Sequence, residues 1–571
     1  MMVLPIWNQR FPPPAPSMTV ERVCMRISPE VRKIADDLYA NTVENNEVMI
    51  VKWTFPDGKF PDLSLERAHR DYELAEKTEA EVERMLATGS LTHEDEMILK
   101  ILSHYCGYIR KNYLNWWQRF DLNSIYRVIP TLFEKMVSLP IGTSEERVFY
   151  LEILKGFPPF VQFLEDKLVA QAARYIRMPK MCCDLVIEAL HAVQESLGRA
   201  NRFAGCEQDT AELVAKVAHL VELVSGDYYD QAPTAIGMGQ YPGGAELYER
   251  EIDTYISCNE KPEAIQARGY EELAKTEAEM LEIARGLGYE GSFMEVMREI
   301  QADPRYLFHS PEEMQEALTG YLDEIRPIIV DCFSRMPKAD CGVARTSVED
   351  EQASSWGFYH VPVPGENNRG IYYYSAAELD KRCQIRMKAV VYHELLPGHH
   401  YQMNLALEDD TLPDIIHHHY NTAYADGWAE YASGMGRELK LYEPVNDYGR
   451  LSWDSFLCCR LIIDTGLNAL GWTYGQAREF LLEHTMFTDL EIHTELVRYT
   501  CGMPAQALAY KWGSLFFRDM RRRAEVELGD DFDIKRYHEA ILAYGAIPLD
   551  LLEEHFEWYL EQEKARIENN R

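Results

Sequence analysis

The eight residues His393-Glu394-Leu395-Leu396-Pro397-Gly398-His399-His400 constrain this 571-residue chain more than any other segment. They place three imidazoles and a carboxylate in one short stretch. In the common zinc-binding helix, His-Glu-x-x-His, two histidines four residues apart project from one face, and the glutamate stands beside the metal as a base. Here Pro397 occupies the position of the second histidine, so the usual spacing is broken.

A straight helix cannot bring a later histidine to the same ion as His393. At about 100° per residue, the six steps to His399 end roughly 240° round the axis, and that ring would point away. The seven steps to His400 return to the same face but roughly 10.5 Å further along the axis, whereas each zinc–nitrogen bond is only about 2 Å long.

The Pro397-Gly398 pair offers a way out of this geometry. Proline lacks an amide hydrogen and clashes with the preceding turn, and glycine can end a helix or open it into a bulge. We therefore expect the helix to be distorted here, so that His399 swings back toward the metal. The alternative is a helix that ends at Gly398 and carries solvated histidines as its tail.

A carboxylate ligand is expected from a second segment, Tyr424-Ala425-Asp426-Gly427-Trp428-Ala429-Glu430-Tyr431. Zinc sites with two histidines often take a third ligand from a following helix and leave a fourth position for water. Asp426 and Glu430 stand four residues apart and would share one helix face. We predict His393, His399 and one of these two carboxylates as ligands of a single zinc ion. Otherwise these are surface carboxylates on an amphipathic helix.

These motifs resemble a large family of bacterial proteins known as domain of unknown function 885. The shared pattern is His-Glu-x-x-Pro-Gly-His-His-x-x-Gln, then Glu-Gly-Trp-Ala-x-Tyr, then Arg-Tyr-x-x-x-Pro-x-Gln-Ala-x-x-Tyr. This chain carries the first element at residues 393–402 and the third at residues 498–510. Weaker similarity runs upstream through Tyr248 to about residue 147. The family is similar to zincin metallopeptidases, so the resemblance implies a zincin-like metallohydrolase core.

Asp426 departs from the family pattern, which has glutamate at that position. The surrounding Gly-aromatic-Ala arrangement resembles the helix that supplies the carboxylate ligand in gluzincin aminopeptidases. This resemblance implies Asp426 as the third ligand beside His393 and His399, with Glu430 as the alternative carboxylate. Because aspartate is shorter by one methylene, either the helix sits closer to the metal, or Glu430 takes over, or the metal is held more loosely.

The expected activity is hydrolysis of amide bonds in short peptides or related small amides, of an exopeptidase or dipeptidase type. Glu394 would act as the general base toward a metal-activated water. The resemblance points to Arg498, Tyr499 and Tyr510 as donors for the developing oxyanion, and spacing does not say which of them reaches the site. His400, Gln402 and Glu430 are candidates for orienting the ligands by hydrogen bonds.

Other functions are compatible with the same scaffold. The chain could be a metal-dependent deacylase of small molecules, a lyase, or a binding protein that has kept the fold without the chemistry. Glu394 favours catalysis, because a merely structural zinc ion needs no base beside it. The consecutive histidines 417–419 are interpreted as a solvated or capping cluster, since consecutive helical residues diverge by about 100°.

The composition excludes several kinds of partner. With 93 acidic and 58 basic residues the formal net charge is −35, which argues against nucleic-acid and anionic-membrane partners. No apolar stretch approaches the ~18–20 residues of a spanning helix, and residues 1–16 lack the order of a signal peptide. We expect a cytoplasmic protein with reduced, buried cysteines. The oligomeric state is left open.

The periodicity predicts a mainly α fold with a small antiparallel β-sheet. We expect a Pro-containing tail at residues 1–20, a helical region at 21–240 and a zincin-like catalytic region at 241–571. Within the last, the sheet is expected at about 342–375 and the metal helix at about 380–398, followed by C-terminal helices. Residues 370–374 are the candidate edge strand for binding an extended substrate, an interior strand being the alternative. The clearest helical periods cover residues 63–86, 93–113, 145–154, 159–176, 209–224, 262–269 and 271–287.

Overall fold

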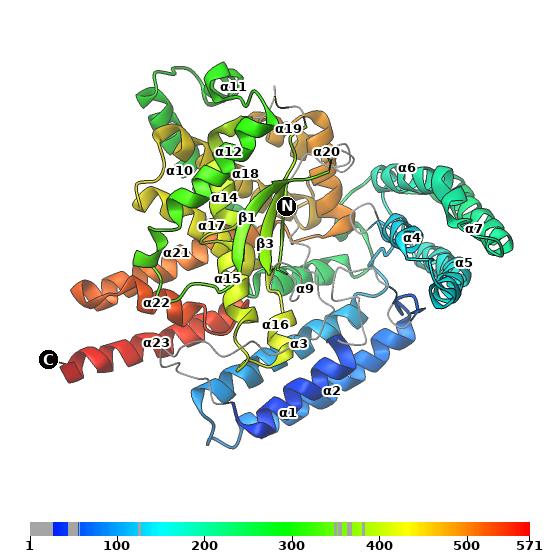
Figure 1. Ribbon diagram of the computed structural model, residues 1–571, viewed down its shortest axis with the longest axis horizontal. Helices are drawn as coiled ribbons and strands as arrows, with labels where there is room; N and C mark the ends of the chain where they lie inside the picture. The colour runs from blue at the N-terminus through cyan, green and yellow to red at the C-terminus, as the bar shows by residue number, and fades with distance from the viewer. Residues whose placement is uncertain are drawn as a thin grey trace.

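The computed structural model describes residues 27–43, 55, 58–123, 127–347, 351, 357–362, 368–377, 379 and 383–570. The tail expected at residues 1–20 lies outside this part of the chain. Helices dominate the described residues, as the sequence predicts, and a small sheet lies among those of the second half (Figure 1). None of the described helices is both long enough and apolar enough to cross a membrane.

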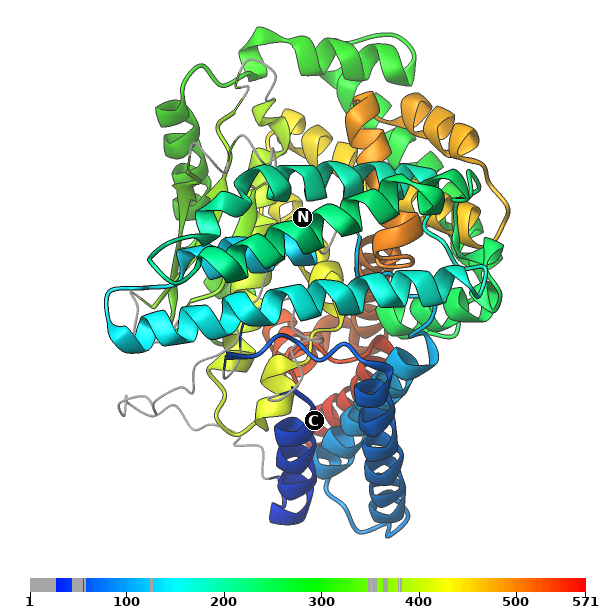
Figure 2. The same cartoon turned by 90° about the vertical axis from the view of Figure 1, so that its right-hand side faces the viewer.

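The first half of the described chain is helical throughout. Figures 1 and 2 show α5, α6 and α7 side by side in a layer that covers one side of the molecule, while α1, α2 and α3 pack together at another. The helices are α1 (Pro29–Leu38), α2 (Leu65–Leu86), α3 (His93–Leu114), α4 (Val128–Ser138), α5 (Ser144–Ala172), α6 (Lys180–Ser196), α7 (Glu207–Ser225) and α8 (Asp227–Asp230).

The second half carries the sheet between two sets of helices, with a π-helical turn at Arg498–Gly502. The helices before the sheet are α9 (Gly244–Ile256), α10 (Pro262–Gly286), α11 (Phe293–Ala302) and α12 (Pro311–Ile325). Those after it are α14 (Met387–Glu394), α15 (His399–Leu407), α16 (Asp414–His418), α17 (Thr422–Glu438), α18 (Pro444–Asn468), α19 (Tyr474–His484), α20 (Asp489–Val497), α21 (Leu508–Leu528), α22 (Ile534–Ile541) and α23 (Leu549–Asn570).

Side-chain caps fix the starts of several predicted helices. The hydroxyl of Ser64 accepts the backbone N–H of Arg67 at the start of α2, and Thr92 accepts that of Asp95 at the start of α3, both at 3.1 Å. Such caps satisfy N–H groups that the first turn of a helix leaves unpaired. The helices predicted at residues 63–86 and 93–113 are thereby confirmed, and the one at 209–224 is confirmed as α7.

Two breaks that the sequence predicts do not occur in the described chain. α5 runs through Pro158 and Pro159 as one helix, so separate helices at residues 145–154 and 159–176 are a wrong prediction. α10 likewise continues through Gly269. A proline inside a helix costs about 3 kcal/mol and a glycine about 1 kcal/mol relative to alanine. Packing of α5 on α7 and of α10 along α18 outweighs these local costs.

The sheet is mixed, and the prediction of an antiparallel sheet is wrong. Its strands are β1 (Asp340–Arg345), β2 (Phe358–His360) and β3 (Arg369–Tyr374), in the order β1-β3-β2. β3 pairs with β1 in parallel and with β2 in antiparallel fashion. In chain order β2 lies between β1 and β3 and runs opposite to both, so β3 enters beside β1 in the same direction. Because β3 is the central strand, residues 370–374 form the interior alternative and not an edge strand.

One hydrophobic core extends through most of the described chain, from Val31 in α1 to Leu560 in α23. It includes buried residues on both sides of the boundary expected near residue 240. Toward its centre, α14 contacts α12, α17 and α18, and α17 packs along α21 (Figure 1). The described cysteines are free thiols, mostly buried, as expected. These central helices carry most of the residues that the sequence assigns to the metal centre.

Helices α17 and α21 cross at two glycines. A β-carbon at Gly513 would lie 1.9 Å from the carbonyl oxygen of Ala423, and one at Gly427 would lie 2.5 Å from Cα of Gly513. Neither distance leaves room for a side chain, so backbone contacts backbone at this crossing. The contact fixes how closely α17, with Asp426 and Glu430, approaches α21.

We predict that Gly513→Ala lowers the free energy of unfolding by about 2–3 kcal/mol, because the added methyl group forces the two backbones apart. Gly434→Ala is the matched control on α17, since no atom lies within 4 Å of a β-carbon placed there. That variant should gain up to ~1 kcal/mol from helix propensity. Denaturant unfolding measures both, and equal stabilities for the two variants would contradict the close crossing.

Candidate metal centre

The helix that carries His393 and Glu394 ends at Glu394, and α15 begins at His399. A break therefore lies around Pro397-Gly398, as the sequence predicts, although the helix expected at about residues 380–398 is shorter and runs only from Met387 to Glu394. A β-carbon at Gly398 would lie 1.8 Å from the carbonyl oxygen of His393. The backbone thus folds directly over the end of α14, which only glycine allows.

A contact from α17 stabilises this reversal of the chain. The indole N–H of Trp428 donates to the carbonyl oxygen of Pro397 at 3.0 Å, and the Leu396–Pro397 peptide bond is cis. Trp428 is fully buried. The broken segment and the carboxylate-bearing helix are therefore held in one position relative to each other.

His393, His399 and Asp426 meet in the interior. Each offers one ligand atom, and these atoms all lie within 4.8 Å of one another. The two imidazoles are perpendicular with ring centroids 4.7 Å apart, and His399 Nε2 lies 3.5 Å from Asp426 Oδ1. The structure thus brings together the three residues that the sequence proposes as ligands, with Asp426 and not Glu430 as the carboxylate.

Several polar atoms at this point are buried without a hydrogen-bond partner among the described residues. They are His393 Nε2, both ring nitrogens of His399 and Glu394 Oε2. Buried polar atoms are almost always paired, because an unpaired one costs the free energy of its desolvation. Two imidazoles and one carboxylate with unpaired donor atoms fit a divalent cation, and nitrogen and oxygen donors of this kind suit zinc.

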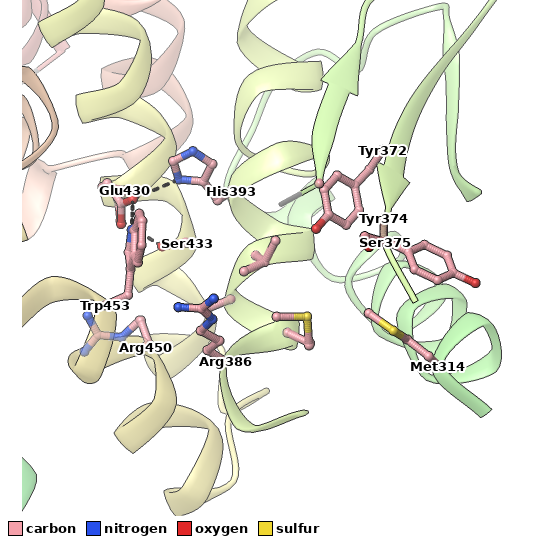
Figure 3. A pocket seen from close by; sticks show the side chains of 14 residues that line it. Met314, Tyr372, Tyr374, Ser375, Arg386, His393, Glu430, Ser433, Arg450 and Trp453 are labelled. Carbon is pink, nitrogen blue, oxygen red and sulfur yellow. Dashed lines mark hydrogen bonds and ion pairs between the residues drawn. The ribbon is translucent and has the colours of Figure 1, made fainter. Parts of the chain in front are cut away.

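Glu430 lies behind His393 and contacts its other ring nitrogen. His393 Nδ1 is 3.1 Å from Glu430 Oε1, and the indole N–H of Trp453 donates to the same oxygen at 2.8 Å (Figure 3). Burial lowers the pKa of His393, but the charge and hydrogen bond of Glu430 outweigh it and raise that pKa to about 9. Glu430 therefore orients His393 so that Nε2 faces the cluster.

Tyr420 performs the same task for Asp426, and the sequence analysis does not identify it. Its hydroxyl donates to Asp426 Oδ2 at 3.4 Å, while Oδ1 faces His399. Burial, followed by the charge of Asp426, holds the pKa of Tyr420 well above its usual range. Tyr420 precedes α17, outside any helical repeat with Asp426, so spacing gives no signal for it.

Glu394 lies beside the two histidines and is almost fully buried. Burial raises the pKa of its carboxyl group, and the neighbouring imidazoles of His393 and His399 lower it only in part. Its unpaired oxygen adds an acceptor to the same interior space. A carboxylate in this position can accept a proton from a molecule bound at the cluster.

The three residues of the C-terminal motif occupy different positions. Burial, followed by the charge of Asp426, raises the pKa of Tyr510. The hydroxyl of Tyr499 instead donates to Glu495, and Arg498 donates to Gln506. Buried Arg460, which the sequence analysis also does not identify, pairs with Glu495 at 3.0 Å. Arg498 and Tyr499 thus belong to an ion network behind Tyr510.

Two other candidates do not contact the cluster in any described hydrogen bond. His400 donates from Nε2 to the carbonyl oxygen of Ala339 at 3.0 Å and accepts the hydroxyl of Tyr359 at Nδ1, 2.8 Å away, so it ties α15 to the sheet. Burial lowers the pKa of His400 to about 4, consistent with a neutral ring. Gln402 is buried on α15, and its Oε1 is unpaired within the described chain. Histidines 417–419 stay apart from the cluster.

Comparison with known proteins shows a matching family and a shared fold. A family model described as "Bacterial protein of unknown function (DUF885)" matches residues 48–556. No curated protein matches the chain. A crystal structure from Colwellia psychrerythraea, 24% identical, superposes with a TM-score of 0.76 over 93% of this chain and 99% of that one. A solved structure from Shewanella oneidensis, 14% identical, superposes with a TM-score of 0.72 over 92% of this chain and 98% of that one. Both are called "putative lipoprotein", and at these identities they show the shared fold alone.

We predict that His393→Ala, His399→Ala and Asp426→Ala each lose stoichiometric zinc, because each removes one of three ligands. Glu430→Gln should weaken zinc affinity by about 10–100-fold, the usual cost of removing an orienting partner. Elemental analysis and competition with a chelating dye measure both. His418→Ala is the control histidine, since its ring contacts the hydroxyl of Tyr39 just after α1 and the backbone carbonyl oxygen of Asp414 within α16. Stoichiometric zinc in His393→Ala would refute the ligand set.

Proposed function

The chain belongs to the DUF885 family of bacterial proteins, and from that premise we propose that it is a zinc-dependent hydrolase that cleaves amide bonds in short peptides or related small amides. A zincin-like core is part of this proposal. It is supported by the order of the elements, in which a sheet precedes the His-Glu helix α14 and α17 then supplies the carboxylate.

The observation that carries the proposal is the buried group of unpaired atoms on His393, His399 and Glu394 next to Asp426. His393, His399 and Asp426 would hold the ion, and zinc bound there would lower the pKa of a water molecule and polarise a substrate carbonyl group. A structural site would need the three ligands but not the unpaired Glu394 beside them.

The remaining steps fall to side chains of the chain itself. Glu394 accepts a proton from the attacking water, whose oxygen adds to the carbonyl carbon. It then returns that proton to the departing nitrogen as the C–N bond breaks, giving a carboxylic acid and an amine. Tyr510 donates a hydrogen bond to the carbonyl oxygen, where negative charge develops. Tyr420 and Glu430 keep Asp426 and His393 oriented throughout.

The absence of nucleic-acid and membrane partners and the cytoplasmic location stay predictions. They rest on the net charge of −35 and on the composition of the N-terminal residues, which lie outside the described part of the chain. The oligomeric state stays open.

We predict that Glu394→Gln lowers turnover by about 10²–10⁴-fold, the usual contribution of a general base, while zinc remains bound. The measurement is hydrolysis of a library of dipeptides and N-acyl amino acids, with zinc content determined on the same sample. Glu299→Gln, an exposed position on α11, should change neither quantity. Unchanged turnover in Glu394→Gln would refute the mechanism, and zinc binding without cleavage of any library member would favour a deacylase, a lyase or a binding protein.

A second prediction separates the two tyrosines of the C-terminal motif. Tyr510→Phe should lower kcat by about 10²–10³-fold with little change in KM, because it removes a donor to the developing charge. Tyr499→Phe, the matched control, loses a hydroxyl that is already bonded to Glu495, and should act mainly on stability. Steady-state kinetics and thermal unfolding distinguish the two effects. Equal losses of kcat in the two variants would argue against Tyr510 as the donor to the carbonyl oxygen.

A further inference from the structure

A pocket adjoins the metal centre on the side of His393 and Glu430. Its empty space, part of it open to solvent, amounts to about 650 Å³ and lies between α14, the middle of α17, the first half of α18 and strand β3. Figure 3 shows His393 and Glu430 at one end of the pocket, Tyr372 and Trp453 on opposite sides, and Arg386 further from the metal ligands. A molecule bound in the pocket would therefore have one end beside the metal centre.

The walls of this pocket are mainly apolar and aromatic. Met387, Val390 and His393 line it from positions three residues apart, which form one face of α14. Trp453 is fixed by its bond to Glu430, and Tyr372 stands on the central strand of the sheet. Apolar pockets with a few placed polar groups select bulky apolar ligand groups and orient them.

Arg386 adds positive charge to the end of the pocket away from His393. Its guanidinium carbon lies 5.6 Å from the centre of the Trp453 ring. The second arginine of the lining, Arg450, is paired with Asp447 at 3.0 Å. Among the described lining residues Glu430 carries the one carboxylate, and it is bonded to His393 and Trp453. A guanidinium has five N–H donors, so Arg386 can bind a ligand carboxylate in addition to other partners.

We propose that this pocket binds the C-terminal residue of a short peptide or N-acyl amino acid, with a bulky apolar side chain between Tyr372 and Trp453 and the free carboxylate at Arg386. The carboxylate of an acidic side chain could also reach Arg386, but such a side chain has no large apolar group for the walls to cover. A hydrophobic residue at the C-terminus of a peptide has both a free carboxylate and an apolar side chain. The inference rests on the proposed function, because that function places the scissile amide at the metal centre. It makes the enzyme a carboxypeptidase or acylase that releases hydrophobic amino acids.

The test is direct binding to the full-length, zinc-loaded Glu394→Gln protein, in which cleavage of the peptide should be about 10²–10⁴-fold slower. Calorimetry compares N-acetylglycyl-phenylalanine with its C-terminal amide and with N-acetylglycyl-glycine. The affinity for the free acid should be at least about 10-fold higher than for the amide, as expected for a charge-assisted hydrogen bond. Its affinity should exceed that of the glycine peptide by a similar factor, because the glycine peptide has no aromatic ring to bury in the pocket.

Variants of Arg386 decide whether the preference comes from this pocket. Arg386→Gln should abolish the preference for the acid over the amide, and Arg386→Lys, which keeps the charge, should retain part of it. Arg298→Gln, on an exposed position of α11, is the matched control and should leave the preference intact. Zinc content and thermal unfolding verify that each variant is folded.

Equal affinity for the acid and the amide, or a preference that survives Arg386→Gln, would overturn the proposal. Its failure is separable from that of the proposed function, which is measured by cleavage of the same peptides with the unmodified protein. Selective binding through Arg386 without cleavage would uphold the pocket and refute the hydrolase. Cleavage without selectivity for a hydrophobic C-terminal residue would uphold the hydrolase and refute the pocket.

Discussion

The reversal of the chain at Pro397-Gly398 determines where every other group of the metal centre can lie. On a continuous helix the imidazoles of His393 and His399 would point in different directions, whereas the reversal brings their ring centroids to a distance of 4.7 Å. It depends on the missing β-carbon of Gly398, because such an atom would lie only 1.8 Å from the carbonyl oxygen of His393. Proline prevents the helix from continuing, and glycine lets it turn back.

Helix α17 completes the centre because it is held from two sides. The indole of Trp428 bonds the carbonyl oxygen of Pro397, and Gly427 lies against Gly513 of α21. With α17 placed in this way, the shorter side chain of Asp426 reaches the cluster, and Glu430, one turn later, lies behind His393. Two carboxylates on one helix face thus have different neighbours, because Asp426 faces His399 and Glu430 contacts the other ring nitrogen of His393.

Charge explains why this interior arrangement calls for a cation. Glu394 and Asp426 are buried and the side chain of Glu430 is only 8% exposed, next to two imidazoles, in a chain whose formal net charge is −35. Buried carboxylates cost free energy unless they are paired or coordinate a metal. Partners account for Glu430 through Trp453 and for one oxygen of Asp426 through Tyr420. A divalent ion is the proposed partner of the donor atoms that stay unpaired within the described chain, and the pocket at Arg386 is the proposed site for one end of the substrate.

The sequence by itself determined the donors of the centre and the break between them, because ligand chemistry and the behaviour of proline and glycine are local properties. It also located helices such as α2, α3 and α7, whose caps and apolar periods lie within each segment. Only the tertiary structure decided the continuity of α5 through its prolines, the parallel pairing of β1 with β3, the contact of Tyr420 with Asp426 and the separation of Tyr510 from Tyr499. The first two depend on contacts between segments distant in sequence, whose free energy exceeds local preference. Tyr420 lies only six residues before Asp426 but outside α17, so helical spacing does not reveal their contact.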